Sequence, residues 1–370
     1  MTLRVEDIKL TDFRNYEHFE LAEIGPLTVL VGPNAIGKTN IIEGIQLMTS
    51  LTSFRHPTID QVIRRGAQVS RTESRITDGD RLLDVAMTLQ EHKRKYTLNG
   101  KAKRPADLKG LMPSVAFTPD DLELVKGSMS TRRAALDALG SQLSANHYLI
   151  KKDYEKVIRY KNRLLKEGTS AALLDSINET LVTCGAQLSC YRAALFAKLS
   201  LEIARRYADI SHGERLTARY APSWQADVSR ETSTFSREEA REELARALEA
   251  RRGEEIARKR SLVGPHADRV DFSIEGQDAS LFGSQGQQRS VVLAYKLAEA
   301  AVIEEVLDQK PILLLDDVMS ELDAFRRRAL VEFISGDVQT FITTANLAYF
   351  DQSLLDNARV VELPRKDSSL

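Results

Sequence analysis

Near its N-terminus the chain reads Gly32-Pro33-Asn34-Ala35-Ile36-Gly37-Lys38-Thr39, which fits the pattern G-x-x-x-x-G-K-[ST] of phosphate-binding loops. The flanking segments supply the strand and helix that such a loop requires. Residues 27–31 form an apolar run typical of a buried strand, and residues 40–48 carry apolar side chains at helical spacing. An isolated glycine-rich turn with an exposed lysine is the alternative, and these flanks disfavour it. The stretch predicts an ATP- or GTP-binding site at the end of a buried strand.

Each position of this loop suits phosphate chemistry. Glycines at 32 and 37 let successive backbone N–H groups face an anion, and the following helix adds the positive end of its dipole. The Lys38 ammonium is expected to bridge phosphate oxygens, and the Thr39 hydroxyl is expected to ligate Mg²⁺. We assign residues 32–39, together with Asn40 at the start of the helix, to nucleotide binding.

A second strand supplies the carboxylate that a magnesium site needs. Residues 311–315 are mostly apolar and are followed by Asp316 and Asp317. Asp316 is the expected metal-side ligand, since buried parallel strands end at the edge where such sites form. Asp317 is the candidate group to orient or deprotonate an attacking water. The alternative for Asp317 is a helix cap or a surface acid.

A polar turn opens a long apolar helix between these two motifs. The turn reads Ser284-Gln285-Gly286-Gln287, and residues 291–303 have helical apolar periodicity. By itself the turn reads as a helix N-cap. The order of motifs is nevertheless that of ATP-binding-cassette ATPases: phosphate loop, signature turn, two-acid strand, then residues 320–323. That resemblance implies that Ser284 to Gln287 cap the γ-phosphate held by another subunit and that Asp323 belongs to the nucleotide site.

The chain resembles one bacterial family within the SMC-like branch of cassette ATPases, the RecF recombination mediators. The resemblance extends over nearly the whole chain. Two features depart from cassette ATPases at large: the second acid is Asp317 where Glu is usual, and Thr343 and Thr344 end a strand where His is common. The matching strings, besides the ATPase motifs, are residues 12–16, 117–127, 132–133, 262–266 (Leu-Val-Gly-Pro-His) and 284–290.

The resemblance implies a function that spacing and charge do not reveal. The family is expected to form an ATP-dependent homodimer that clamps duplex DNA near single-strand gaps and their junctions. With RecR and RecO partners it helps to load RecA, in support of replication-fork recovery and the SOS response. ATP and Mg²⁺ are the expected ligands. Slow, DNA-stimulated hydrolysis is expected, with ATP acting mainly as an assembly switch.

Composition agrees with a cytoplasmic protein that has no membrane partner. Hydrophobic residues make up 42% of the chain and charged residues 28%, and no apolar run approaches the length of a membrane span. The N-terminal residues are charged from residue 4, so they lack a signal-peptide core. Cys184 and Cys190 are predicted to be free thiols in a reducing compartment.

The expected fold is α/β: a cassette-type, SMC-like ATPase head with a β-rich N-terminal part and an inserted helical arm. We expect an N-terminal head lobe at 1–125, the arm at 126–258 and a C-terminal head lobe at 259–370. Residues 130–167 and 171–210 are mostly strong helix formers, and helices of that length extend about 57 Å. They are expected to project as an antiparallel pair. The alternative is a helical subdomain folded against the head.

Charge is balanced overall, with 52 Lys and Arg against 53 acids, so it does not decide for or against nucleic acid. Residues 51–110 are locally basic, with 13 Lys or Arg against 7 Asp or Glu. Such clusters grip phosphates without reading bases, although most charged runs are solvated surface. Residues 251–252 and 258–260 form a second basic stretch. The candidate DNA contacts in the first region are Arg64, Arg65, Lys93, Arg94, Lys95, Lys101, Lys103 and Arg104.

Two other classes compete with an SMC-like repair ATPase. A transporter-coupled cassette subunit fits the loop, the signature turn and the acid strand. A metabolic kinase with a phosphate loop fits only the loop and one acid. The signature turn argues against the kinase, and the long helical insert between loop and signature argues against the transporter subunit.

Overall fold

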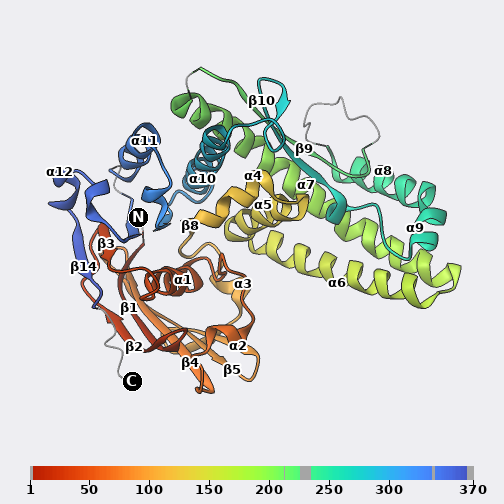
Figure 1. The fold of residues 1–370 in the computed structure, drawn as a ribbon. Helices are drawn as coiled ribbons and strands as arrows, with labels where there is room; N and C mark the ends of the chain where they lie inside the picture. Colours follow the sequence, from red (N-terminus) through yellow and green to blue (C-terminus); the bar gives the residue numbers. More distant parts are fainter. Residues whose placement is uncertain (1–2, 212, 226–234, 336–337, 365–370) are drawn as a thin grey trace. The chain divides into compact units, whose positions relative to one another are not determined.

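The computed structural model describes residues 3–211, 213–225, 235–335 and 338–364. The chain divides into two compact units. The first combines Met1–Asp121 with Ile303–Leu370, and the second is Leu122–Val302. The elements of each unit are labelled in Figure 1.

The first unit contains a parallel sheet whose strand order is β14-β3-β13-β12-β8. All four pairings are parallel. The two strands between β3 and β8 are buried along their whole length, as expected when both faces of a parallel sheet are covered. The strands are β3 (Leu27–Val31), β8 (Ser114–Phe117), β12 (Ile312–Asp316), β13 (Thr340–Thr344) and β14 (Arg359–Glu362).

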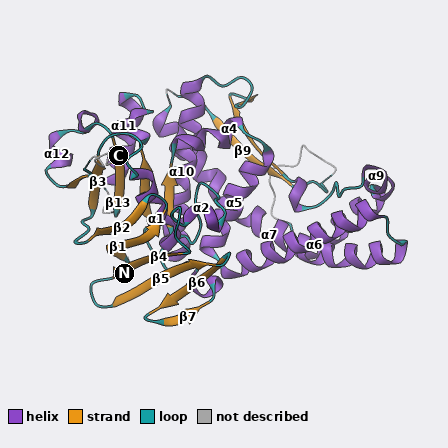
Figure 2. Ribbon diagram, turned by 60° about the horizontal axis from the view of Figure 1, so that its bottom comes forward, coloured by secondary structure: helices purple, strands orange, loops and turns teal. Residues whose placement is uncertain are grey.

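An antiparallel sheet of order β2-β1-β4-β5-β6-β7 accompanies it in the same unit. At Asn99-Gly100 both residues have positive φ, 50° and 73°, which is the left-handed turn that this dipeptide predicts. Figure 2 shows the two sheets as orange strands. The strands are β1 (Arg4–Phe13), β2 (Tyr16–Leu21), β4 (Val69–Thr77), β5 (Leu82–Gln90), β6 (Lys93–Leu98) and β7 (Lys101–Lys103).

Helix α1 (Lys38–Thr49) shares one hydrophobic core with both sheets of this unit. It packs so closely on β1 that a Cβ at Gly44 would lie 2.8 Å from a methyl carbon of Leu10. The core therefore fixes the helix that follows the phosphate loop. The other α-helices that lie wholly within the described part of this unit are α11 (Ala324–Ile334), of 11 residues, and three of four residues each: α2 (Ile59–Val62), α3 (Pro105–Leu108) and α12 (Gln352–Leu355).

The second unit is mainly helical. Helices α6 and α7 run side by side, and α8 packs along α7 (Figure 1). A three-stranded antiparallel sheet of order β11-β10-β9 completes the unit. Its elements are α4 (Glu123–Lys126), α5 (Met129–Leu143), α6 (Ala145–Glu167), α7 (Ala171–Ile210), β9 (Leu216–Ala221), α8 (Arg237–Ala250), α9 (Arg252–Arg258), β10 (Arg269–Ile274) and β11 (Gln277–Asp278); α10 (Gln285–Leu307) begins here and ends in the first unit.

The predicted helix over residues 130–167 is wrong in one respect, because it is two helices. Ser144 is extended (φ −148°, ψ 123°) and its hydroxyl accepts a hydrogen bond from the His147 N–H, so it caps α6. The His147 ring then packs on Gly140, where a Cβ would lie 2.3 Å from the ring. Helix α7 has 40 residues, as its length in the sequence predicts.

The helical unit contains more than the predicted antiparallel pair of helices. Its core joins α6, α7 and α8 around Trp224, which packs edge-on against Phe235. The division at 302/303 differs from the predicted start of the C-terminal lobe at 259. Residues 259–302 contribute β10, and β10 pairs with β9. This pairing, together with the buried side chains of Val263, Pro265 and Asp268, holds that segment in the helical unit.

Candidate nucleotide-binding site

The phosphate loop connects β3 to α1, as its sequence predicts. Gly37 precedes α1 with φ 117°, a conformation that strains any residue with a side chain. A Cβ there would also lie 2.7 Å from the Tyr16 hydroxyl and 2.8 Å from an Asn15 amide nitrogen. Ala35 has φ 65° as well. The loop thus bends sharply twice within its length.

The Lys38 ammonium folds back over this loop. It donates hydrogen bonds to the carbonyl oxygens of Gly32 at 2.6 Å and Pro33 at 2.9 Å. Burial lowers the pKa of the Lys38 ammonium, while the carboxylates of Asp317 and Asp316 act in the opposite direction. The cation is thus held at the mouth of the loop by neutral carbonyls that anionic oxygens can displace.

The structure brings together the loop and the two-acid strand. Asp316 is the last residue of β12, and its Oδ1 accepts hydrogen bonds from Thr39 Oγ1 at 2.9 Å and Thr343 Oγ1 at 2.7 Å. Thr343 lies on β13, which separates β3 from β12 in the sheet. Burial raises the pKa of the Asp316 carboxyl, and the two threonine hydroxyls lower it in part. The Thr39 hydroxyl and the buried Asp316 carboxyl therefore meet at the carboxyl ends of the parallel strands.

Asp317 follows in the left-handed conformation, with φ 54° and ψ 22°. Its N–H donates to the Thr343 carbonyl oxygen at 3.2 Å and to Thr343 Oγ1 at 3.0 Å. Burial raises the pKa of its carboxyl, and the Lys38 ammonium lowers it in part. Thr343, which stands where cassette ATPases commonly have His, thus contacts both acids.

Three polar residues that the sequence interpretation did not assign to the site support the loop from outside. Asn15 Nδ2 donates to the Ile36 carbonyl at 3.0 Å, and its Oδ1 accepts from Asn40 Nδ2 at 2.7 Å. Arg55 donates to Asn40 Oδ1 at 2.7 Å, and its charge lowers the pKa of Asp316 in part. The only sequence signal was that Asn15 lies in the family-like string at 12–16.

Glu43 is the third of these residues, and its side chain is fully buried on α1. Its two carboxylate oxygens accept hydrogen bonds from Arg14 at 2.8 and 2.6 Å, and Oε1 also accepts from Ser53 at 2.6 Å. Arg55 lies 3.4 Å from Oε2. Because the charge is paired and hydrogen-bonded, its burial is tolerated. The cluster fixes the segment that carries Arg55 against the helix of the loop.

The signature-like turn lies in the second unit and forms a capping box at the start of α10. Ser284 Oγ accepts from the Gln287 N–H at 3.2 Å, and Gln287 Oε1 accepts from the Ser284 N–H at 2.8 Å. Gln287 Nε2 donates to Glu214 Oε1 at 2.6 Å, and the Tyr207 hydroxyl donates to Glu214 Oε2 at 2.9 Å. Glu214 and Tyr207 carried no signal in the sequence.

The N-cap interpretation of this turn is therefore confirmed, and it leaves the signature role open. Ser284 and Gln285 are exposed, while Gly286 and Gln287 are partly buried. Asp323 is also an N-cap, because its carboxylate accepts from the Arg326 N–H at 2.9 Å at the start of α11.

The predicted basic residues fall into two groups. Arg64 is paired with Asp12 at 2.6 Å, and Arg104 is paired with Asp107 at 2.9 Å. Among the residues that the structure describes, no carboxylate lies within 4 Å of the other six cations of this set. In the second stretch Arg251, Arg252 and Arg258 are all paired with acids. The six are Arg65, Lys93, Arg94, Lys95, Lys101 and Lys103.

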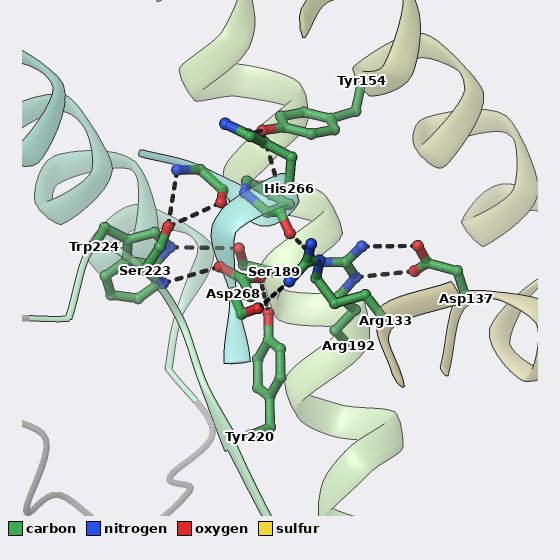
Figure 3. A network of polar contacts seen from close by, with 12 residues as sticks. Arg133, Asp137, Tyr154, Ser189, Arg192, Tyr220, Ser223, Trp224, His266 and Asp268 are labelled. Carbon is green, nitrogen blue, oxygen red and sulfur yellow. Dashed lines mark hydrogen bonds and ion pairs between the residues drawn. The ribbon is translucent and has the colours of Figure 1, made fainter. Parts of the chain in front are cut away.

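The family-like Gly-Pro-His string at 264–266 has a structural role in the second unit (Figure 3). Arg192 makes two hydrogen bonds to the Asp137 carboxylate, at 2.9 and 2.7 Å, and a third to the Pro265 carbonyl at 2.6 Å. Arg192 also lies 3.1 Å from Asp268. The His266 ring is 2.6 Å from the Tyr154 hydroxyl. The string therefore ties α5, α6 and α7 to the strand that follows it.

Comparison with known proteins agrees with this geometry. The family described as RecF/RecN/SMC N terminal domain matches residues 4–366. The chain is 36% identical over 369 residues to the DNA replication and repair protein RecF of Synechococcus sp. (strain JA-3-3Ab), covering 96% of this chain and 95% of that protein. Its identity to the protein of the same name from Bacillus subtilis (strain 168) is 34% over 361 residues, with 96% of each covered.

Solved structures give the same result. The recombination mediator protein RecF-ATP in the RecFOR pathway matches with a TM-score of 0.86 and 28% identity, covering 95% of this chain and 94% of that one. An Smc head domain with an extended coiled coil from Pyrococcus furiosus matches with a TM-score of 0.54 at 14% identity, which shows the shared fold alone. The fold defines an SMC-like head with a long helical insert. Within that class, the chain belongs to the RecF family.

In the part of the chain that the structure describes, none of the helices combines the length and the apolar character that crossing a membrane requires.

Proposed function

We propose that this chain is an ATP-gated, duplex-DNA-binding ATPase of recombinational repair. The observation that carries the proposal is the contact between the phosphate loop and the acid strand, where Thr39 Oγ1 lies 2.9 Å from Asp316 Oδ1. An ATPase needs a phosphate cradle and a metal-side carboxylate at one place. Membership of the RecF family favours repair over transport or small-molecule phosphorylation.

Thr39 and Asp316 are the residues that would hold Mg²⁺. Both offer hard oxygen atoms, which this ion prefers, and one or two such protein ligands suffice because phosphates and waters complete its shell. Burial raises the pKa of Asp316, so its ionised form gains from a neighbouring cation. Bound there, Mg²⁺ supplies positive charge next to the phosphate oxygens.

Lys38 and the loop N–H groups bind the nucleotide phosphates. The ammonium exchanges its bonds with the carbonyls of Gly32 and Pro33 for bonds to anionic oxygens, which are stronger. Asn40 acts from outside, because its side chain joins Asn15 and Arg55 to the start of α1. We assign Asp317 to the positioning of the attacking water, since its raised pKa and its nearness to Lys38 suit proton transfer.

The second half of each nucleotide site comes from another copy of the chain. Ser284 and Gln285 are exposed at the N-terminus of α10, where N–H groups and the helix dipole favour an anion. Two ATP molecules are then buried between two heads, each held by one phosphate loop and by the partner's signature turn. Loss of the γ-phosphate removes the second set of contacts and releases the dimer.

Dimerisation places DNA-binding surfaces of two copies on one duplex. We propose that the complex marks single-strand gaps and their junctions, and that RecR and RecO partners act with it to load RecA in fork recovery and the SOS response. Hydrolysis is slow and DNA-stimulated, since its task is to end the bound state. The unpaired cations among residues 93–103 are the first candidates for phosphate contacts in the first unit.

The test is duplex-DNA binding at fixed salt with ATP, with ADP and without nucleotide, measured alongside the oligomeric state by light scattering. Salt is held constant because phosphate contacts dominate such affinities. The proposal expects a dimer and tight DNA binding with ATP alone. If ATP induced a dimer without changing DNA affinity, the proposal that ATP controls DNA binding would be wrong. If the protein stayed a monomer under all three conditions, the proposal that ATP controls dimerisation would be wrong.

A further inference from the structure

Helix α6 carries five cations on one face. Their spacing is 4, 3, 4 and 3 residues, so at 100° per residue they lie within about 80° of one another around the helix, along about 21 Å of its length. Every one of them is exposed. Helix α6 packs against α7 (Figure 2). We name this face the α6 stripe; it consists of Lys152, Lys156, Arg159, Arg163 and Lys166.

The α6 stripe is not neutralised by its surroundings. No carboxylate lies within 4 Å of its cations among residues 3–211, 213–225, 235–335 and 338–364. The neighbouring Lys151, which lies off the stripe, is paired with Glu155 at 3.2 Å. Two exposed arginines elsewhere in the unit are paired: Arg246 contacts Glu242 and Glu243, and Arg258 contacts Glu254.

The stripe weakens the helix that carries it. Like charges three or four residues apart on a helix repel one another, and each consecutive pair in the stripe has this spacing. The helix dipole favours cations only in the last turn. It explains Lys166 and Arg163 but not Lys152 and Lys156, which lie about four and three turns before the helix ends at Glu167. The helix dipole therefore does not account for the first half of the stripe.

We propose that the α6 stripe binds the phosphate backbone of duplex DNA. This inference rests on the proposed function and names a DNA-contacting surface in the second unit, far in sequence from the cations at 93–103. A row of cations on a rigid helix suits the regularly spaced anions of a stiff duplex backbone, which carries one phosphate per about 3.4 Å of axis on each strand. Single-strand binding instead relies on aromatic stacking platforms. Tyr160, 42% exposed, is the single exposed tyrosine on α6.

The direct test is the salt dependence of duplex binding by a variant in which all five stripe cations are replaced by Gln. Glutamine keeps helix propensity and removes the mutual repulsion, so the variant is expected to fold. With ATP present, the slope of log K against log salt should fall by roughly 0.9 for each phosphate that the variant no longer neutralises, about 4.5 for the five cations of one stripe. The matched control also removes five cations, all with exposed, ion-paired side chains and outside the candidate DNA contacts: Lys9, Arg71, Arg205, Arg246 and Arg269 are replaced by Gln, and the slope should equal that of the wild type.

The outcomes separate this inference from the proposed function. If the wild type does not bind duplex DNA with ATP, the proposed function fails. If the wild type binds and the stripe variant keeps both slope and affinity, the stripe does not contact DNA and serves another partner, such as an acidic protein surface. An equal fall of the slope in the control variant would also overturn the inference, because the effect would then follow net charge and not the stripe.

Discussion

Thr39 and Asp316 lie 277 positions apart in the sequence and are joined by a 2.9 Å hydrogen bond from Thr39 Oγ1 to Asp316 Oδ1. The bond joins the start of α1, the helix that follows β3, to the end of β12. In the sheet, β13 lies between β3 and β12. It places a hydroxyl and a carboxyl where a phosphate-bound cation needs both. The account of this protein as a nucleotide switch depends on this meeting point.

Replacing Asp317 by Asn should separate ATP binding from hydrolysis. The amide keeps the size of the side chain but cannot accept the proton of an attacking water, so turnover should fall about 100-fold or more. ATP binding by the monomer should persist, and the ATP-bound dimer should live longer. Steady-state phosphate release and dimer lifetime measure the two effects. Unchanged turnover would remove Asp317 from the reaction.

Replacing Asp316 by Asn should stabilise the nucleotide-free protein while abolishing magnesium-dependent ATP binding. Burial raises the pKa of Asp316 in the folded state, so its contribution to stability is fully present below its unfolded pKa and is lost as pH rises through the folded pKa. The Asn side chain does not ionise, so the variant does not lose stability in this way as pH rises. Its Oδ1 can still accept hydrogen bonds from Thr39 and Thr343. The difference in Tm between variant and wild type should therefore grow as pH rises from about 4 toward neutrality. A difference independent of pH would contradict this reasoning.

Replacing Glu214 by Ala should weaken the signature turn without touching the phosphate loop. Glu214 fixes the Gln287 amide, which in turn holds the Ser284 N–H. Loss of this charge-assisted hydrogen bond should weaken ATP-dependent dimerisation about tenfold per site. Glu214→Gln keeps an acceptor for Gln287 Nε2 and should recover most of the loss. ATP binding by the monomer, measured with a fluorescent nucleotide, should be the same in all three proteins.

Replacing Arg192 by Met should destabilise the helical unit strongly. The guanidinium is buried and compensates the carboxylates of Asp137 and Asp268, so its removal leaves uncompensated buried charge and should cost about 3–5 kcal/mol. Arg246→Met is the matched control, since that arginine is exposed and its ion pairs contribute no more than about 1 kcal/mol. Chemical denaturation of the two variants makes the comparison. If the two variants lost similar amounts of unfolding free energy, the ion-pair network around Arg192 would not account for the stability of the helical unit.

The sequence was sufficient for the parts of the site that local pattern determines. The phosphate loop, its flanking strand and helix, and the end of β12 at Asp316 all follow from apolar runs and glycine positions. The capping interpretation of Ser284 also follows from local chemistry. The left-handed pair at Asn99-Gly100 likewise follows from residue type, because few residues other than Asn and Gly tolerate positive φ.

The remainder depended on contacts between distant segments. The break at Ser144 reflects the packing of His147 on Gly140, which no helix propensity reveals. Glu43, Arg55 and Glu214 are charged residues whose partners lie on other elements. In the sequence, each is therefore indistinguishable from an ordinary charged surface residue. The Gly-Pro-His string was visible as a family marker, yet its role appears only once Arg192 meets Pro265.

The most direct test of the composite site mixes two defective variants. Lys38→Met removes the phosphate loop's cation and should abolish tight ATP binding, whereas Ser284→Arg blocks the signature turn and should leave ATP binding by the monomer intact. Neither variant should dimerise alone. Mixed together with ATP, they should form a heterodimer, because the loop of the Ser284→Arg chain meets the intact turn of the Lys38→Met chain. Light scattering should therefore detect a dimer only in the mixture. A dimer of Ser284→Arg alone, or no dimer in the mixture when the wild type dimerises, would contradict a site shared between two copies.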